Sequence, residues 1–130
     1  MPHLTIEYTA NLESALHLPA LIEALHATAA GIDIFPLAGL RTRAERRDTY
    51  RVADGHPDNA FVHLILRIGH GRALEVRQAA GEKLFAAPCA HLEPLLATTP
   101  LAISFEIQEI DPVLNYTSGN IREYLARRAG

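Results

Sequence analysis

The sequence has little cysteine, no long hydrophobic run and no large excess of either charge. Its one cysteine, Cys89, excludes an internal disulfide and any metal site built from several cysteines. No run of about eighteen apolar residues is present, so no membrane span is expected. The N-terminus also lacks the basic region and apolar block of a secretory signal. The net charge of −3 does not favour nucleic acid or an anionic membrane as a partner. We therefore expect a soluble, cytoplasmic protein.

Metal-binding patterns are also missing, although the chain contains seven histidines. The histidines are scattered, with no HExxH motif and no neighbouring cysteine, which favours surface and packing roles for most of them. A length of 130 residues suits one compact domain, which we expect to span residues 1–130.

Hydrophobic periodicity predicts a first β-α-β unit. Residues 3–8 alternate between apolar and polar, as in a strand with one buried face. Residues 18–31 have the apolar spacing of a helix. After a loop around Pro36 and Gly39, a polar segment favours extended structure through residues such as Thr42, Thr49, Tyr50 and Val52.

The same pattern predicts a second β-α-β unit. Residues 60–69 form the strongest strand pattern in the chain, which is typical of a central strand. Residues 73–98 read as a longer amphipathic helix, which Pro88 is expected to kink or interrupt and Pro94 to end. Residues 101–110 alternate again, as in a half-buried strand.

Each unit is about sixty residues long, which fits a crossover helix between parallel strands. We therefore expect an α+β, two-layer fold in which duplicated β-α-β units form one sheet with two helices on one face. A last, peripheral helix is expected over residues 121–130. Little of the chain is left to cover the other sheet face, which predicts oligomerisation through the sheet faces and edges.

Pro2 is the first candidate for a chemical role. Removal of Met1 would give Pro2 a free secondary amine. An α-amino group normally has a pKa of about 7.7–8.0, and burial beside cations lowers it. A base poised near the working pH suits proton abstraction next to a carbonyl. The alternative is that Pro2 merely begins a strand, a position that tolerates proline.

Two arginines are the next candidates. Arg41 follows the loop sequence "PLAG", from which a side chain can reach into a cleft. Arg72 ends "GHGR", where a strand turns into a helix and an anion would be favoured. The alternative for Arg72 is a salt bridge with Glu75. Arg46 and Arg47 are expected on a solvated basic face.

Six stretches of the sequence together support a family resemblance. They are "MPH", "GIDIFPLAGLRTR", "DTYRVADG", "AFVHLILRIGHGR", "RQAAGEKLF" and "LAISFEIQEIDPVLNY", and they run in this order from Pro2 to about Asn115. In these stretches the chain resembles the 5-carboxymethyl-2-hydroxymuconate Δ-isomerase family of the tautomerase superfamily. Residues 117–130 lie outside the resemblance and are expected to form a C-terminal extension.

The resemblance implies a tautomerase-like fold, a homotrimer and no cofactor. The family converts 5-carboxymethyl-2-hydroxymuconate to its 5-oxo, β,γ-unsaturated isomer in homoprotocatechuate breakdown, with an amino-terminal proline as general base. That proline corresponds to Pro2. The family's arginines correspond to Arg41 and Arg72, the expected binders of substrate carboxylates and of developing charge on oxygen.

The expected function is thus a cofactor-independent isomerase with a small carboxylate substrate. Two alternatives stay open. One is a hydratase or dehalogenase of unsaturated acids, in which a protonated amine acts as the acid. The other is a small trimeric ligand-binding protein in which Pro2 is vestigial.

Overall fold

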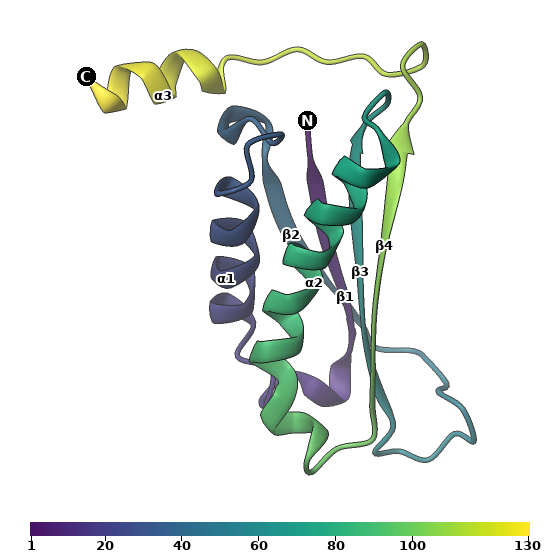
Figure 1. The fold of residues 1–130 in the computed structure, drawn as a ribbon. Coiled ribbons are helices and arrows are strands. Elements are labelled where there is room, and N and C mark those ends of the chain that lie inside the picture. The colour runs from purple at the N-terminus through teal and green to yellow at the C-terminus, as the bar shows by residue number, and fades with distance from the viewer.

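Two β-α-β units follow one another, as predicted, and a third helix ends the chain (Figure 1). The computed structural model describes residues 1–130. Its elements are β1 (His3–Thr9), η1 (Ala10–Leu12), α1 (Leu18–Ala30), η2 (Leu37–Gly39), β2 (Arg41–Arg47), β3 (Ala60–Gly69), α2 (Leu74–Leu96), β4 (Leu101–Ile110) and α3 (Ile121–Ala129), where η1 and η2 are short 3-10 helices.

The four strands form one mixed sheet in the order β2-β1-β3-β4. Strands β1 and β2 are parallel, as are β3 and β4, and the two pairs meet antiparallel between β1 and β3. The starts of β1 and β2 therefore lie at the same end of the sheet as the ends of β3 and β4. This end is uppermost in Figure 1, and we call it the upper end of the sheet.

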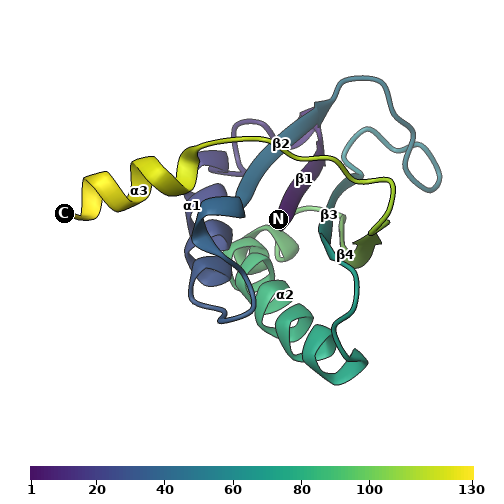
Figure 2. The same ribbon diagram turned by 90° about the horizontal axis from the view of Figure 1, so that it is seen from above.

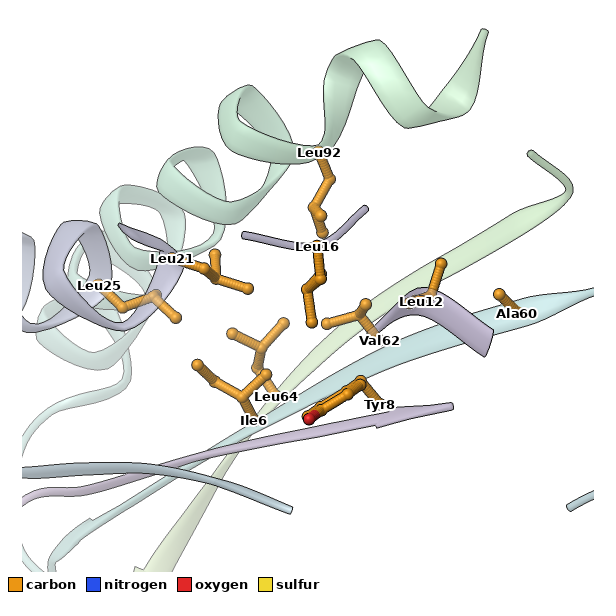
Figure 3. Close-up of a cluster of buried hydrophobic side chains, with 10 residues drawn as sticks. All are labelled: Ile6, Tyr8, Leu12, Leu16, Leu21, Leu25, Ala60, Val62, Leu64 and Leu92. Atoms are coloured by element: carbon orange, nitrogen blue, oxygen red, sulfur yellow. The ribbon is translucent and has the colours of Figure 1, made fainter. Parts of the chain in front are cut away.

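Helices α1 and α2 cover one face of the sheet, which confirms the predicted two-layer α+β architecture. The alternate residues Leu4 and Ile6 of β1 and Val62 and Leu64 of β3 are fully buried beneath the helices. Figure 3 shows the larger of two core clusters, in which Leu92 of α2 closes over these strands. Burying each such side chain stabilises the fold by about 1.5–3 kcal/mol, and the core holds the strand ends in place.

The extended structure predicted beyond Arg47 is wrong. Strand β2 pairs with β1 as far as Thr9 and Arg47, and β1 then turns into η1. Tyr50 and Val52 therefore have no strand to pair with, and they lie in the loop between β2 and β3. Their β propensity does not overcome the missing partner.

Pro88 does not interrupt α2, so that part of the prediction is wrong. The helix continues through Pro88 and Pro94 and ends two residues later, at Leu96. A proline inside a helix costs about 3 kcal/mol. Leu84 and Leu92, one turn on either side of Pro88, are fully buried. Their burial offsets this cost, since each contributes about 1.5–3 kcal/mol.

The other face of the sheet has no helix over it (Figure 2). It presents the alternate residues of the strands that are partly or fully exposed, which mix apolar side chains such as Phe61 and Ile65 with charged ones such as Glu7 and Arg43. We call this surface the open sheet face. None of the helices is long and apolar enough to cross a membrane.

Candidate functional site

The upper end of the sheet brings the first two predicted site residues together. Pro2 is buried, and its carbonyl accepts a hydrogen bond from the Arg41 backbone N–H at 3.0 Å. This bond continues the parallel pairing of β1 with β2, in which His3 lies opposite Arg41. The predicted candidates therefore meet because two parallel strands begin side by side.

Gly39 lets the loop before β2 approach the chain start closely. A Cβ atom at this position would lie 3.2 Å from the Met1 Cα atom and 3.3 Å from the Met1 nitrogen, closer than is usual for such contacts. The same Cβ would lie 3.7 Å from the Pro2 Cδ atom, an ordinary contact distance. The glycine in "PLAG" is therefore needed to fit Met1 rather than Pro2.

Arg41 has an exposed side chain that bends back toward this loop. Its Nη1 atom donates a hydrogen bond to the Gly39 carbonyl at 2.9 Å. A guanidinium group has five N–H donors, so most of those on Arg41 remain free to bind an anion.

Arg72 is held more firmly than Arg41. Its Nη2 atom donates to the Ile34 carbonyl at 2.8 Å and its Nη1 atom to the Gly69 carbonyl at 3.3 Å. Arg72 forms no ion pair with Glu75, so the salt-bridge alternative is wrong. The guanidinium instead links the end of β3 to the loop after α1.

Glu109 of β4 stabilises the turn that carries Arg72, and the sequence analysis missed it. Its carboxylate accepts a hydrogen bond from the Gly71 N–H at 3.2 Å and lies 3.3 Å from Nη1 of Arg77. Arg77 in turn donates from Nε to the Arg72 carbonyl at 3.1 Å. The Gly71 N–H, which lies in the turn where the sequence favours an anion, thus binds the protein's own carboxylate. The sequence did contain a signal for Glu109: it follows Leu101, Ile103, Phe105 and Ile107 at alternate positions of β4, so it is a charged residue on the less exposed face of the strand.

Both guanidinium groups act on the chain start. Burial lowers the pKa of the Met1 α-amino group below its ordinary value, and the positive charges of Arg72 and Arg41 lower it further. Both effects increase the neutral fraction of an amine at this position. Pro2 is the next residue, directly before β1, and its carbonyl is bonded to the Arg41 backbone.

The C-terminal segment lies beside the chain start at the upper end of the sheet. Helix α3 has no buried residue, which agrees with the peripheral helix that the sequence predicts. After β4 the chain passes over the upper end of the sheet, and α3 contacts η2 (Figures 1 and 2). A cleft of about 530 Å³ lies between this segment and the chain start. Its lining includes Met1, Gly39 and Arg41 on one side and residues 117–122 on the other.

The other arginines of β2 remain outside this cleft. Arg46 pairs with Asp48 at 3.1 Å, and Arg47 pairs with Glu7 at 2.6 Å and Glu45 at 2.7 Å. Arg46 and Arg47 are about half exposed, as predicted, but they point to opposite faces of β2 and each pairs with acidic side chains, so they do not form one basic face. No group of three or more His, Cys, Asp or Glu side chains is placed to hold a metal ion.

Comparison with known proteins connects this arrangement to one family. The sequence model of the family described as 5-carboxymethyl-2-hydroxymuconate isomerase matches residues 2–125. The match continues past Asn115 and so includes much of the segment expected to be an extension. A 5-carboxymethyl-2-hydroxymuconate Delta-isomerase from Escherichia coli is 45% identical over 121 residues, which cover 93% of this chain and 96% of that protein.

Solved structures agree with the sequence match. A 5-carboxymethyl-2-hydroxymuconate isomerase from Deinococcus radiodurans R1 is 40% identical, with a TM-score of 0.89 over 95% of this chain and 93% of that one. A second structure, a 5-carboxymethyl-2-hydroxymuconate delta-isomerase, is 31% identical, with a TM-score of 0.90 over 96% and 93% of the two chains. The chain is an isomerase that belongs to the 5-carboxymethyl-2-hydroxymuconate isomerase family, within the tautomerase superfamily.

Proposed function

We propose that this protein, once Met1 is removed, isomerises 5-carboxymethyl-2-hydroxymuconate with the amine of Pro2 as general base. The observation that carries the proposal is a partly buried chain start, bonded to the start of β2 at Arg41, whose amine has its pKa lowered by burial and by the charges of Arg72 and Arg41. Family membership supplies the substrate. The reaction belongs to homoprotocatechuate breakdown in the cytoplasm.

The Pro2 nitrogen is part of a peptide bond while Met1 is present, so removal of Met1 is a condition of the mechanism. The freed secondary amine is neutral near physiological pH if burial and the two guanidinium groups lower its pKa as they do for Met1. A neutral amine accepts the proton of the substrate's 2-hydroxyl group. The protonated amine then returns a proton to the far carbon of the diene, which carries the carboxymethyl arm.

Arg41 and Arg72 have complementary tasks in this proposal. Arg72, held by two backbone carbonyls, is the more rigid and suits stabilisation of charge on the reacting oxygen. Arg41 is more exposed and suits capture of a carboxylate through paired N–H donors. Together they would hold the planar carbon chain across the Pro2 nitrogen.

A homotrimer is part of the proposal. The open sheet face combines apolar side chains such as Ile65 with charged ones, and both β2 and β4 are edge strands. Three large apolar side chains after β4, Val113, Leu114 and Tyr116, are more than two-thirds exposed. Association with further copies of the chain would cover these surfaces.

The test is an ultraviolet assay of the purified protein with 5-carboxymethyl-2-hydroxymuconate, after mass spectrometry has shown that Met1 is absent. We expect rapid loss of the conjugated dienol. Pro2→Ala should lower kcat severely with an unchanged circular dichroism spectrum. A form that retains Met1 serves as the matched control, because its Pro2 nitrogen is acylated. Full activity of either protein would show that the amine is not the base.

A further inference from the structure

We propose that Arg122, in the first turn of α3, binds the carboxylate of the substrate's carboxymethyl arm and thereby selects substrates that carry it. This inference rests on the proposed function and assigns a third cation to the same site.

The number of negative charges on the substrate motivates the search for a third cation. Muconate is a dicarboxylate, and the carboxymethyl arm adds a third carboxylate. A guanidinium group matches one carboxylate at a time through two parallel hydrogen bonds. With Arg41 on one carboxylate and Arg72 on the reacting oxygen, these two arginines leave at least one carboxylate without a cation.

The cleft supplies the remaining cation. Arg122 lines the cleft of about 530 Å³ together with Met1 and Arg41. The volume falls within the range of about 300–1,000 Å³ that is usual for small-molecule sites. No acidic side chain lines the cleft, whereas Thr117, Ser118 and Asn120 line it with hydrogen-bonding groups. Its charge and polarity fit an anionic ligand.

Arg122 differs from the other arginines of its helix because it has no partner. It makes no side-chain hydrogen bond and no ion pair in the structure. By contrast, the guanidinium carbons of Arg127 and Arg128 lie 4.9 Å and 5.7 Å from the centre of the Tyr124 ring. An unpaired guanidinium at the wall of a cleft without acids is placed to bind a ligand carboxylate.

The experiment compares two substrates that differ only in the arm. The Met1-free protein, its Arg122→Gln variant and an Arg127→Gln control are assayed with 5-carboxymethyl-2-hydroxymuconate and with 2-hydroxymuconate. The control removes the same charge from the same helix, but Arg127 does not line the cleft. We expect Arg122→Gln to lower kcat/KM about tenfold for the substrate with the arm. This is the size expected from losing one charge-assisted hydrogen-bonding contact that is partly exposed to solvent. Turnover of 2-hydroxymuconate should change less than about twofold.

Binding of unreactive analogues separates this inference from the proposed function. Pentane-1,2,5-tricarboxylate has the saturated skeleton with the arm, and hexanedioate has the skeleton without it. Calorimetry should show that Arg122→Gln weakens the binding of the tricarboxylate and leaves the binding of hexanedioate unchanged. This result does not depend on whether the protein turns over either substrate. An equal loss for both analogues, or no loss for either, would overturn the role of Arg122. Failure of the unaltered protein to turn over both substrates would instead overturn the proposed function.

Discussion

Removing the carboxylate of Glu109 is expected to weaken catalysis without touching the proposed substrate site. Glu109 reaches Arg72 only indirectly, through the Gly71 N–H and the side chain of Arg77, and it also lies 3.4 Å from Nδ1 of His70 in the same turn. In Glu109→Ala all three contacts are lost. The turn that ends in Arg72 is then held mainly by the bonds of Arg72 to the Ile34 and Gly69 carbonyls.

The contacts of Glu109 allow the losses of stability and of kcat/KM in Glu109→Ala to be estimated. The hydrogen bond from Gly71 contributes about 1 kcal/mol, and the partly exposed ion pair with Arg77 adds about 0–1 kcal/mol. We expect the free energy of unfolding to fall by about 1–2 kcal/mol, or Tm by roughly 4–8 °C for a chain of this length. Displacing a substrate-binding group by about 1 Å costs up to about 100-fold in rate. We therefore expect kcat/KM to fall between about tenfold and 100-fold.

The pH profile of kcat/KM distinguishes a displaced Arg72 from a protein that is merely less stable. Burial lowers the pKa of the Met1 amine most, and the charges of Arg72 and Arg41 lower it further. The proposed function extends these effects to the Pro2 amine of the trimmed protein. Moving Arg72 away raises that pKa, so the acid limb of the profile should shift to higher pH. Loss of the Glu109 charge alone would act in the opposite direction, because removing an anion favours the neutral amine. Lower stability alone would reduce kcat/KM at every pH and leave the pKa of the acid limb unchanged.

Two matched variants complete the assay. Glu109→Gln loses the same charge but keeps an oxygen that can accept the Gly71 N–H, so it should fall between the wild type and Glu109→Ala. Glu106→Ala removes a carboxylate of the same strand on the open sheet face, where it lies 3.8 Å from His63. It should leave the acid limb unchanged. A Glu109→Ala protein with reduced Tm but a wild-type profile would refute the positioning role.

Three further predictions follow from the geometry. Gly39→Ala should lower Tm more in the form that retains Met1 than in the trimmed form, because the added Cβ crowds Met1 and not Pro2; equal shifts would contradict this. Arg41→Gln should raise KM for dicarboxylates at least fivefold while the matched Arg43→Gln, outside the cleft, should not, as steady-state kinetics would show. Leu92→Ala should lower the free energy of unfolding in urea by about 2–5 kcal/mol, since Leu92 is fully buried; a loss below about 1 kcal/mol would show a core that collapses around the gap.

The fold was predictable from the sequence wherever burial follows a simple period. Leu4 and Ile6, like Val62 and Leu64, alternate with polar or half-exposed neighbours because only one sheet face has helices over it. Prediction failed where a distant partner decides the outcome. Tyr50 has a strong strand propensity, but β1 has already turned away from β2 at that level.

Pro88 shows the same limit for helices. Local rules predict a break there, since proline removes a backbone donor. The core beneath α2 outweighs that cost, because Leu84 and Leu92 are buried on either side of it. The strength of that core depends on β1, β3 and α1, which residues 74–96 alone do not reveal.

The residues of the candidate site also differ in whether the local sequence could reveal them. Pro2, Arg41 and Arg72 adjoin local signals in the sequence: the chain start, a Pro/Gly loop and a glycine-flanked turn. Glu109 and Arg122 reach the upper end of the sheet only through the antiparallel meeting of two β-α-β units and the path of the chain after β4. Because two strands begin and two strands end at this one place, the chain start meets groups from three distant segments. This topology, more than any single motif, concentrates positive charge around the proposed base.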